Sequence, residues 1–180
     1  MLDGSRFTDR ADYEKTEFTE EVKNRDYRLM QSVITPGYSK KVAGVETQKA
    51  PDFSLTLTGY QVIKFNIDDG SYEASGICWN CLPILRYAEV LLNYAEAKAE
   101  LGEFDDAVWN KTIKPLRERA GFDAAYCSYP SSSDLRQVIR DERRVELALE
   151  GRRAFDLRRW ALLDNPSLKS TGATYLTTRA

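Results

Sequence analysis

The amino-acid sequence predicts a mostly α-helical chain in which an irregular α+β portion with short strands precedes a helical array. Apolar residues recur at helical spacing from about residue 83, and single glycines separate the helical runs. The residues before that point alternate only over short stretches between turn residues. We therefore expect one domain over residues 1–180, with an irregular portion at 1–82, a helical portion at 83–163 and a loose tail at 164–180.

The first 82 residues are expected to form short elements joined by loops. Residues 18–23 have the spacing of one or two helical turns, whereas residues 28–34 are rich in strand formers. Residues 39–52 are polar and lysine-rich without a period, which predicts a loop. Residues 55–65 alternate in part and predict one or two short strands that a glycine interrupts.

The helical portion opens with an amphipathic helix after Pro83. One face is apolar and carries Ala88, Leu91, Leu92, Ala95 and Ala99, and the opposite face is polar and carries Glu89, Asn93, Glu96 and Glu100. Gly102 has the position of a residue that ends a helix, and the acids that follow open a second helix. The small residues along this pair resemble a tetratricopeptide hairpin, so we expect a tetratricopeptide-like array.

The next helices are delimited by proline, glycine and a capping residue. Pro115 lacks a backbone N–H, so the second helix either kinks there or restarts with Pro115 at its first position. Gly121 is expected to close this helix. Residues 126–133 form a Ser/Pro loop, after which Asp134 and Gln137 resemble a capping box that opens the next helix.

Carboxylates continue the apolar stripe of that helix. The face begins with Leu135, Val138 and Ile139 and continues through Glu142, Glu146, Leu149 and Glu150. Burying an ionised carboxylate without a partner costs several kcal/mol, so the fold is expected to bring arginines to it. Gly151 is expected to end or bend this helix before an arginine-rich turn to Trp160.

Three interpretations of residues 135–160 compete. The charges could simply form a solvated, ion-paired helix. The arginines could instead bind nucleic-acid phosphates, but the acids among them weaken the positive field that phosphate binding needs. Glu142 and Glu146 could be an acid/base pair, but neighbours on one helix usually share a surface and not a cleft.

Composition limits the function further. The chain has 180 residues, a formal net charge of −2 and no histidine. The net charge argues against a polyanion or an anionic membrane surface as the main partner, and the lack of histidine excludes Ser–His and Cys–His catalysis within the chain. No apolar run reaches membrane-spanning length, and the first residues lack a signal-peptide core. Cys78 and Cys81 could form a local disulfide, remain two thiols or bind a metal, which a single C-x-x-C supports weakly.

One long motif in the chain resembles a known family. The pattern E-R-R-x-E-L-x-x-E-G-x-R-x-x-D-L-x-R-W, at residues 142–160, resembles the signature of the SusD/RagB family of outer-membrane glycan-binding lipoproteins. The segments R-Y-A-E-V-L-L-N-Y-A-E-A at 86–97 and L-R-E-R-A-G at 116–121 are similar to other helical motifs of this family. The segment N-R-D-Y-R-L at 24–29 is similar to the stretch that precedes them.

This resemblance implies a function and a location. Family members bind oligosaccharides at the cell surface without cleaving them and pass them to a SusC-like TonB-dependent transporter in the outer membrane. They carry an export signal and a lipid anchor, so we expect this chain to be a middle-to-late fragment whose anchor lies on a missing N-terminal part. The resemblance implies no metal and no cofactor. It makes Arg86, Arg117 and Arg119 the expected donors to Glu142 and Glu146, because their motifs accompany this one.

Aromatic residues in predicted loops are the candidates for a glycan site. They are Tyr38, Tyr60, Tyr72, Trp79 and Tyr129. Aromatic rings stack on sugars, but they also pack into cores or lie exposed without a ligand. Turn residues flank Tyr72 and Trp79, and neither falls in an apolar period, which makes these two the best candidates.

Two other functions stay open at this point. A tetratricopeptide-like scaffold would bind a peptide in a helical groove and would not respond to glycans. A glycosidase would use Glu142 and Glu146, and the change of either residue to glutamine would abolish sugar release.

Overall fold

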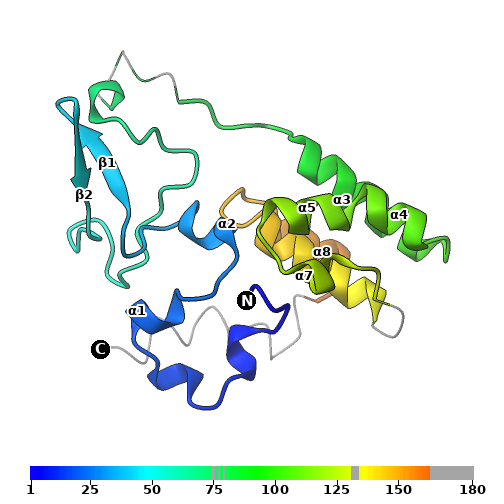
Figure 1. Ribbon diagram of the computed structural model, residues 1–180. Helices are drawn as coiled ribbons and strands as arrows, with labels where there is room; N and C mark the ends of the chain where they lie inside the picture. The colour runs from blue at the N-terminus through cyan, green and yellow to red at the C-terminus, as the bar shows by residue number, and fades with distance from the viewer. Residues whose placement is uncertain (74–75, 77, 79, 131–133, 163–180) are drawn as a thin grey trace.

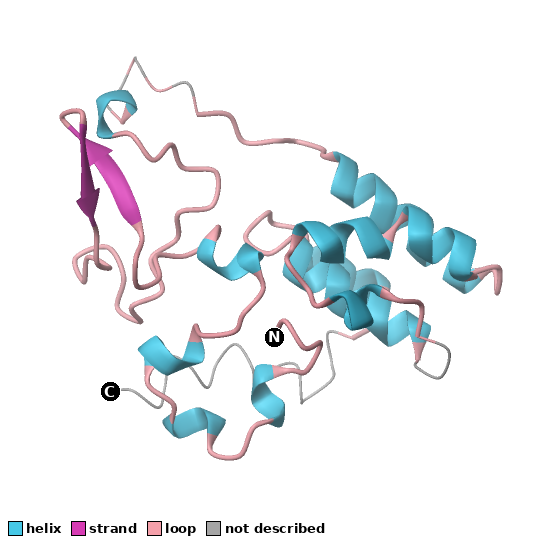
Figure 2. Cartoon of the chain, in the orientation of Figure 1, coloured by secondary structure: helices cyan, strands magenta, loops and turns pink. Residues whose placement is uncertain are grey.

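The computed structural model describes residues 1–73, 76, 78, 80–130 and 134–162. Within these residues the chain is mostly α-helical, with one two-stranded antiparallel sheet, which confirms the predicted fold class. Figure 1 shows the longer helices packed together on one side of the molecule, while the hairpin and the first short helices lie apart from them. The loop-rich character of residues before 83 is plain in Figure 2. The expected tail at 164–180 lies outside the described residues.

The N-terminal portion holds only short helices. Two 3-10 helices span Phe7–Asp9 and Tyr13–Lys15, and α1 spans Phe18–Glu21, as predicted. The prediction of strand character at 28–34 is wrong, because α2 spans Tyr27–Met30. Asp26 explains the difference, since its side chain caps α2 by accepting a hydrogen bond from the Arg28 backbone N–H.

A β-hairpin occupies the segment that was predicted to be a loop. Strand β1 at Ser39–Val42 pairs antiparallel with β2 at Val45–Gln48. Ala43 and Gly44 both have positive φ angles, of 49° and 83°, as a tight hairpin turn requires. The mostly polar strands bury no continuous face, which is why their sequence shows no period.

The strands predicted at 55–65 are also wrong. Within this stretch only Val62 pairs, in an isolated bridge to Val33. Gly59 has a φ of 79° and turns the chain, so no straight strand can form across it. A 3-10 helix at Gly70–Tyr72 follows.

Helix α3 spans Tyr87–Glu100 and ends at the glycine that the sequence predicts. Gly102 has a φ of 71°, and the Glu103 N–H donates to the Lys98 carbonyl at 2.9 Å. This 6→1 hydrogen bond is the Schellman closure of a helix. The helix therefore stops where the left-handed residue stands.

The predicted second helix is two helices. Helix α4 spans Asp106–Lys111 and α5 spans Ile113–Arg119, with the break at Thr112. Pro115 lies in the first turn of α5, where its missing N–H costs no helical hydrogen bond. The helix thus restarts, although Pro115 stands at the third position of α5 and not at the first. Gly121, with a φ of 80°, closes it as predicted.

The last helices differ from the prediction in one boundary and in two additional short helices. Helix α6 spans Ala124–Cys127 and overlaps the start of the loop predicted at 126–133, and α7 spans Leu135–Glu146 after Asp134, whose side chain accepts from the Gln137 N–H. The prediction that Gly151 ends this helix is wrong, because α7 stops at Glu146. Helix α8 then spans Arg153–Arg159. Leu149 has a positive φ and is exposed, so it does not continue the apolar stripe.

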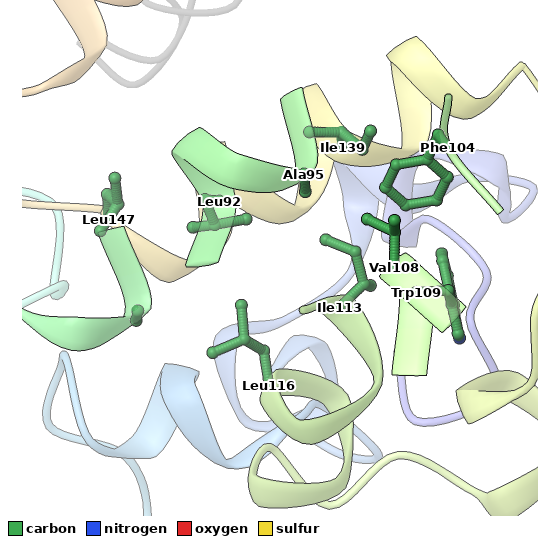
Figure 3. Packing of buried hydrophobic residues seen from close by; sticks show 10 residues of the cluster. Leu92, Ala95, Phe104, Val108, Trp109, Ile113, Leu116, Ile139 and Leu147 are labelled. Atoms are coloured by element: carbon green, nitrogen blue, oxygen red, sulfur yellow. The ribbon is translucent and has the colours of Figure 1, made fainter. Parts of the chain in front are cut away.

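The core lies between α3, α4, α5 and α7 (Figure 3). Trp109 is its largest fully buried side chain, and its indole N–H donates to the Cys127 carbonyl at 2.8 Å. Leu92 and Ala95 of α3 and Ile139 of α7 pack with it, and Tyr129 lies against its edge. This apolar layer holds α7 in place beneath the charged residues at its C-terminal end.

Candidate functional site

Two buried carboxylates of α7 form the centre of the candidate site. Glu142 and Glu146 are only 4% and 2% exposed. Arg28 is the second residue of α2 and bridges the two carboxylates. Its Nη1 donates to Glu142 Oε1 at 2.6 Å and to Glu146 Oε2 at 3.2 Å. Asp26 fixes that guanidinium by accepting from its Nε at 3.0 Å. The site thus joins α2 to α7 across more than one hundred residues of sequence.

The three arginines expected from the family motifs also lie on these carboxylates. Arg117 Nε donates to Glu142 Oε2 at 2.9 Å, and Arg119 Nη2 donates to Glu146 Oε1 at 2.5 Å. Arg86, which precedes α3, donates from Nη1 to Glu146 Oε1 at 2.6 Å. The structure therefore brings all five of these residues together.

A third carboxylate extends the cluster. Glu150 accepts two hydrogen bonds of 2.8 Å from Arg86, one at each carboxylate oxygen. Lys64 donates to Glu150 Oε1 at 2.7 Å and to the carbonyl of Ala148 at 2.7 Å. Sequence reasoning missed Arg28 and Lys64 as partners. Arg28 had a signal, because it belongs to the N-R-D-Y-R-L segment, whereas nothing in the sequence around Lys64 marked it.

The ion pairs lower the pKa of the carboxyl groups. Burial by itself raises the pKa of Glu146, because desolvation disfavours the charged form. The hydrogen bond from Arg86 and the charges of three arginines outweigh burial, so this pKa lies below its ordinary value of 4.5. Burial of Glu150 is likewise outweighed by hydrogen bonds from Arg86 and Lys64, and its pKa is also lowered. Both groups are ionised at neutral pH and are poor proton donors.

A second buried cluster holds α8 against α3 and α7. Arg143 Nε donates to both oxygens of Asp156, at 2.9 and 2.8 Å, and its Nη1 donates to Asn93 Oδ1 at 2.7 Å. Glu96 of α3 accepts from the indole N–H of Trp160 at 2.6 Å. The polar residues of α3 were expected opposite its apolar face. Instead, Glu89 is buried, and it forms an ion pair of 3.1 Å with Arg152 of the motif.

A polar cleft opens beside the first cluster. It has a volume of about 230 Å³ and is lined by Arg28, Gln31, Ser32, Lys64, Phe65, Arg86, Arg119 and Glu146. Four of these residues are cationic and one is acidic. The cleft therefore lies where α2, the segment at 64–65, the start of α3 and the end of α5 meet α7. No group of three or more histidine, cysteine or acidic residues that could hold a metal occurs in the described part of the chain.

Comparison with known proteins decides the family. The model of the SusD family matches residues 1–178. The chain belongs to the SusD family. Searches of the curated proteins and of the solved structures returned no match. The SusD family consists in general of non-catalytic carbohydrate-binding proteins that are typically found at the outer-membrane surface. Among the described residues, no helix is both long enough and apolar enough to span a membrane.

The loop aromatics of this SusD-family chain have different surroundings. Tyr129 packs in the core against Phe104, and the Tyr38 hydroxyl donates to Asp68 at 2.6 Å. Tyr60 packs edge-on against Phe18. These contacts make the three poor candidates for sugar stacking. Tyr72 is 45% exposed in the 3-10 helix at Gly70–Tyr72 and does not line the cleft.

Two other predictions concern the segment before α3. Trp79 lies outside the described residues. Cys78 and Cys81 are both exposed, and the structure does not join them in a disulfide. The loop that such a bond would close is short, so it would add little stability.

Proposed function

We propose that this SusD-family chain binds oligosaccharides at the outer-membrane surface, without cleaving them, for delivery to a SusC-like TonB-dependent transporter. The match to the family model over residues 1–178 carries this proposal. The two buried ion-pair clusters support it, because they involve the residues of the motif and give them a structural role. A lipid anchor would hold the protein at the membrane.

The ion pairs disfavour the glycosidase alternative. Hydrolysis needs one carboxyl group that is protonated near neutral pH and a second that can reach the sugar. The pKa of Glu146 is lowered and not raised, and arginines cover both Glu146 and Glu142. Neither side chain is positioned to give up a proton to a glycosidic oxygen.

A peptide-binding scaffold is the second candidate. One feature favours it, namely an exposed apolar stripe along α3 that contains Tyr87, Val90, Tyr94 and Leu101. These residues share one face of the helix, on the side away from the core. A peptide with an apolar helical face would fit such a stripe.

Glycan-array binding followed by calorimetry tests the proposal. Oligosaccharide binding without hydrolysis products is the expected result, while products would refute the binding-only function. Tyr72→Ala and Trp79→Ala are each expected to weaken binding by about 5- to 150-fold, which corresponds to roughly 1–3 kcal/mol for one stacked ring. Tyr87→Ala is the matched control, because Tyr87 is an exposed aromatic on another element. Weakening by Tyr87→Ala together with binding of apolar peptides would favour the scaffold instead.

A further inference from the structure

The cleft beside the first ion-pair cluster contains hydrogen-bonding groups that the fold itself does not use. The Gln31 carboxamide and the Ser32 hydroxyl line it, and neither makes a hydrogen bond to another side chain or backbone group in the described part of the chain. An amide offers donors and acceptors at once, as does a hydroxyl. Such groups suit a ligand that is rich in hydroxyls.

Arg119 supplies a half-exposed positive charge at the same cleft. Its guanidinium has five N–H donors, and within the described residues only one contact engages it, the hydrogen bond from Nη2 to Glu146. Its side chain is 52% exposed, so the remaining donors can reach a ligand. Arg28 and Arg86 also line the cleft, and the carboxylates of Asp26 and Glu150 hold their guanidinium groups. Most charged residues that line the cleft are therefore cationic, and most of the carboxylates that pair with them are not part of the lining.

Phe65 adds an aromatic wall in an unusual conformation. Its φ is 65°, in the left-handed region that bulky residues rarely adopt. The neighbouring Lys64 is fixed by Glu150 and by backbone carbonyls, which holds this segment in place. Strained residues of this kind concentrate where a side chain must be aimed at a ligand. Phe65 thus adds an aromatic ring to the lining of the cleft, and the Lys64 ammonium lies 5.5 Å from the centroid of that ring.

We propose that this cleft binds one acidic sugar residue, whose carboxylate or sulfate ester is held by Arg119 and whose hydroxyls bond to Gln31 and Ser32. The proposal rests on the glycan-binding function proposed above and names the chemical class of one unit of the glycan. A volume of about 230 Å³ is below that of drug-sized pockets and suits a single ring. Arginine binds carboxylates and other oxyanions through two parallel hydrogen bonds, which neutral sugars cannot accept with equal strength.

Titration of the isotope-labelled chain with D-galacturonic acid, followed by NMR, tests the proposal. We expect the backbone signals of Gln31, Ser32 and Phe65 to shift, with a Kd on the order of millimolar for one ring. D-galactose, which has a CH2OH group in place of the carboxylate, should bind about tenfold or more weakly. Galactose-6-sulfate distinguishes the two acid groups, and tighter binding of either acid than of galactose supports the proposal.

Variants separate the cleft from other cationic surfaces. Arg119→Gln should remove the preference for the acidic sugar, whereas Arg136→Gln should keep it. Arg136 is a matched control, because its side chain is 58% exposed and, among the described residues, makes a single ion pair, with Glu100. Gln31→Ala and Ser32→Ala remove no side-chain hydrogen bond within the described fold, so they should weaken binding by about 2- to 10-fold with little change in the melting temperature.

Several results would overturn the proposal. Equal affinity for galactose and galacturonic acid would remove the acidic-sugar claim and leave the glycan-binding function standing. Acetate that binds as tightly as galacturonic acid would show a general anion site. An unchanged preference in Arg119→Gln, or signal shifts confined to other parts of the chain, would place the site elsewhere. Failure of every sugar here and of every glycan on the array would overturn both this inference and the proposed function.

Discussion

Replacing Glu146 by glutamine removes one buried negative charge while keeping the shape of the side chain. Three arginines donate to this carboxylate, and they differ in what they retain after the change. Arg28 keeps Asp26 and Glu142, Arg86 keeps Glu150, and Arg119 turns to solvent. The loss therefore falls on the charge balance of a buried cluster, and not on side-chain packing.

The magnitude follows from these contacts. Removing one partner of a buried ion pair typically costs about 3–5 kcal/mol. Arg119 is half exposed and contributes little, and the two buried arginines keep other carboxylates, so we expect about 3 kcal/mol for Glu146→Gln. For a chain of this length, that lowers the melting temperature by about 6–12 °C. This loss would be large against the usual stability of a domain.

Thermal and urea unfolding, followed by circular dichroism, measure the effect. Glu100→Gln is the matched control, because Glu100 forms an ion pair with Arg136 at the surface, and its loss should cost less than about 1 kcal/mol. The reasoning would be refuted if Glu146→Gln melted within about 2 °C of the unchanged chain, or if both variants lost equal stability.

Three further predictions concern pH, thiol reactivity and the core. Because the pKa of Glu146 is lowered in the folded chain, its carboxylate contributes stability that is present above the ordinary pKa of 4.5 and is lost as pH falls through the lowered pKa. The melting temperature should therefore fall more steeply in acid for the unchanged chain than for Glu146→Gln. Parallel slopes of melting temperature against pH would contradict this. Iodoacetamide should modify the exposed Cys78 and Cys81 in the native chain, while Cys127, whose pKa is raised by burial, should react only after denaturation. Mass spectrometry measures the labelling, and equal labelling of all three cysteines in the native chain would disprove this prediction. Trp109→Ala should lower the free energy of unfolding by about 3–5 kcal/mol in urea titrations, because the side chain is fully buried, and an unchanged midpoint would contradict its place in the core.

The sequence by itself determined where α3 and α5 stop and what the charged face of α7 needs. Gly102 and Gly121 end helices because each adopts a positive φ that other residues resist, and this preference is local. The Asp134 side chain caps α7 through an equally local contact, a hydrogen bond from the Gln137 N–H. The carboxylates on the apolar stripe required buried cations, and the accompanying motifs named Arg86, Arg117 and Arg119 correctly as the residues that lie there.

Only the tertiary structure decided the short elements and the partners from distant segments. A four-residue helix or strand has too few residues to show a period, so α2 depends on the Asp26 cap and the hairpin depends on the turn at Ala43. Arg28 meets Glu142 across 114 residues, and Lys64 meets Glu150 across 86. Periodicity and capping act within a few residues of one element, whereas the cleft exists because packing of the apolar core brings four separate segments against α7.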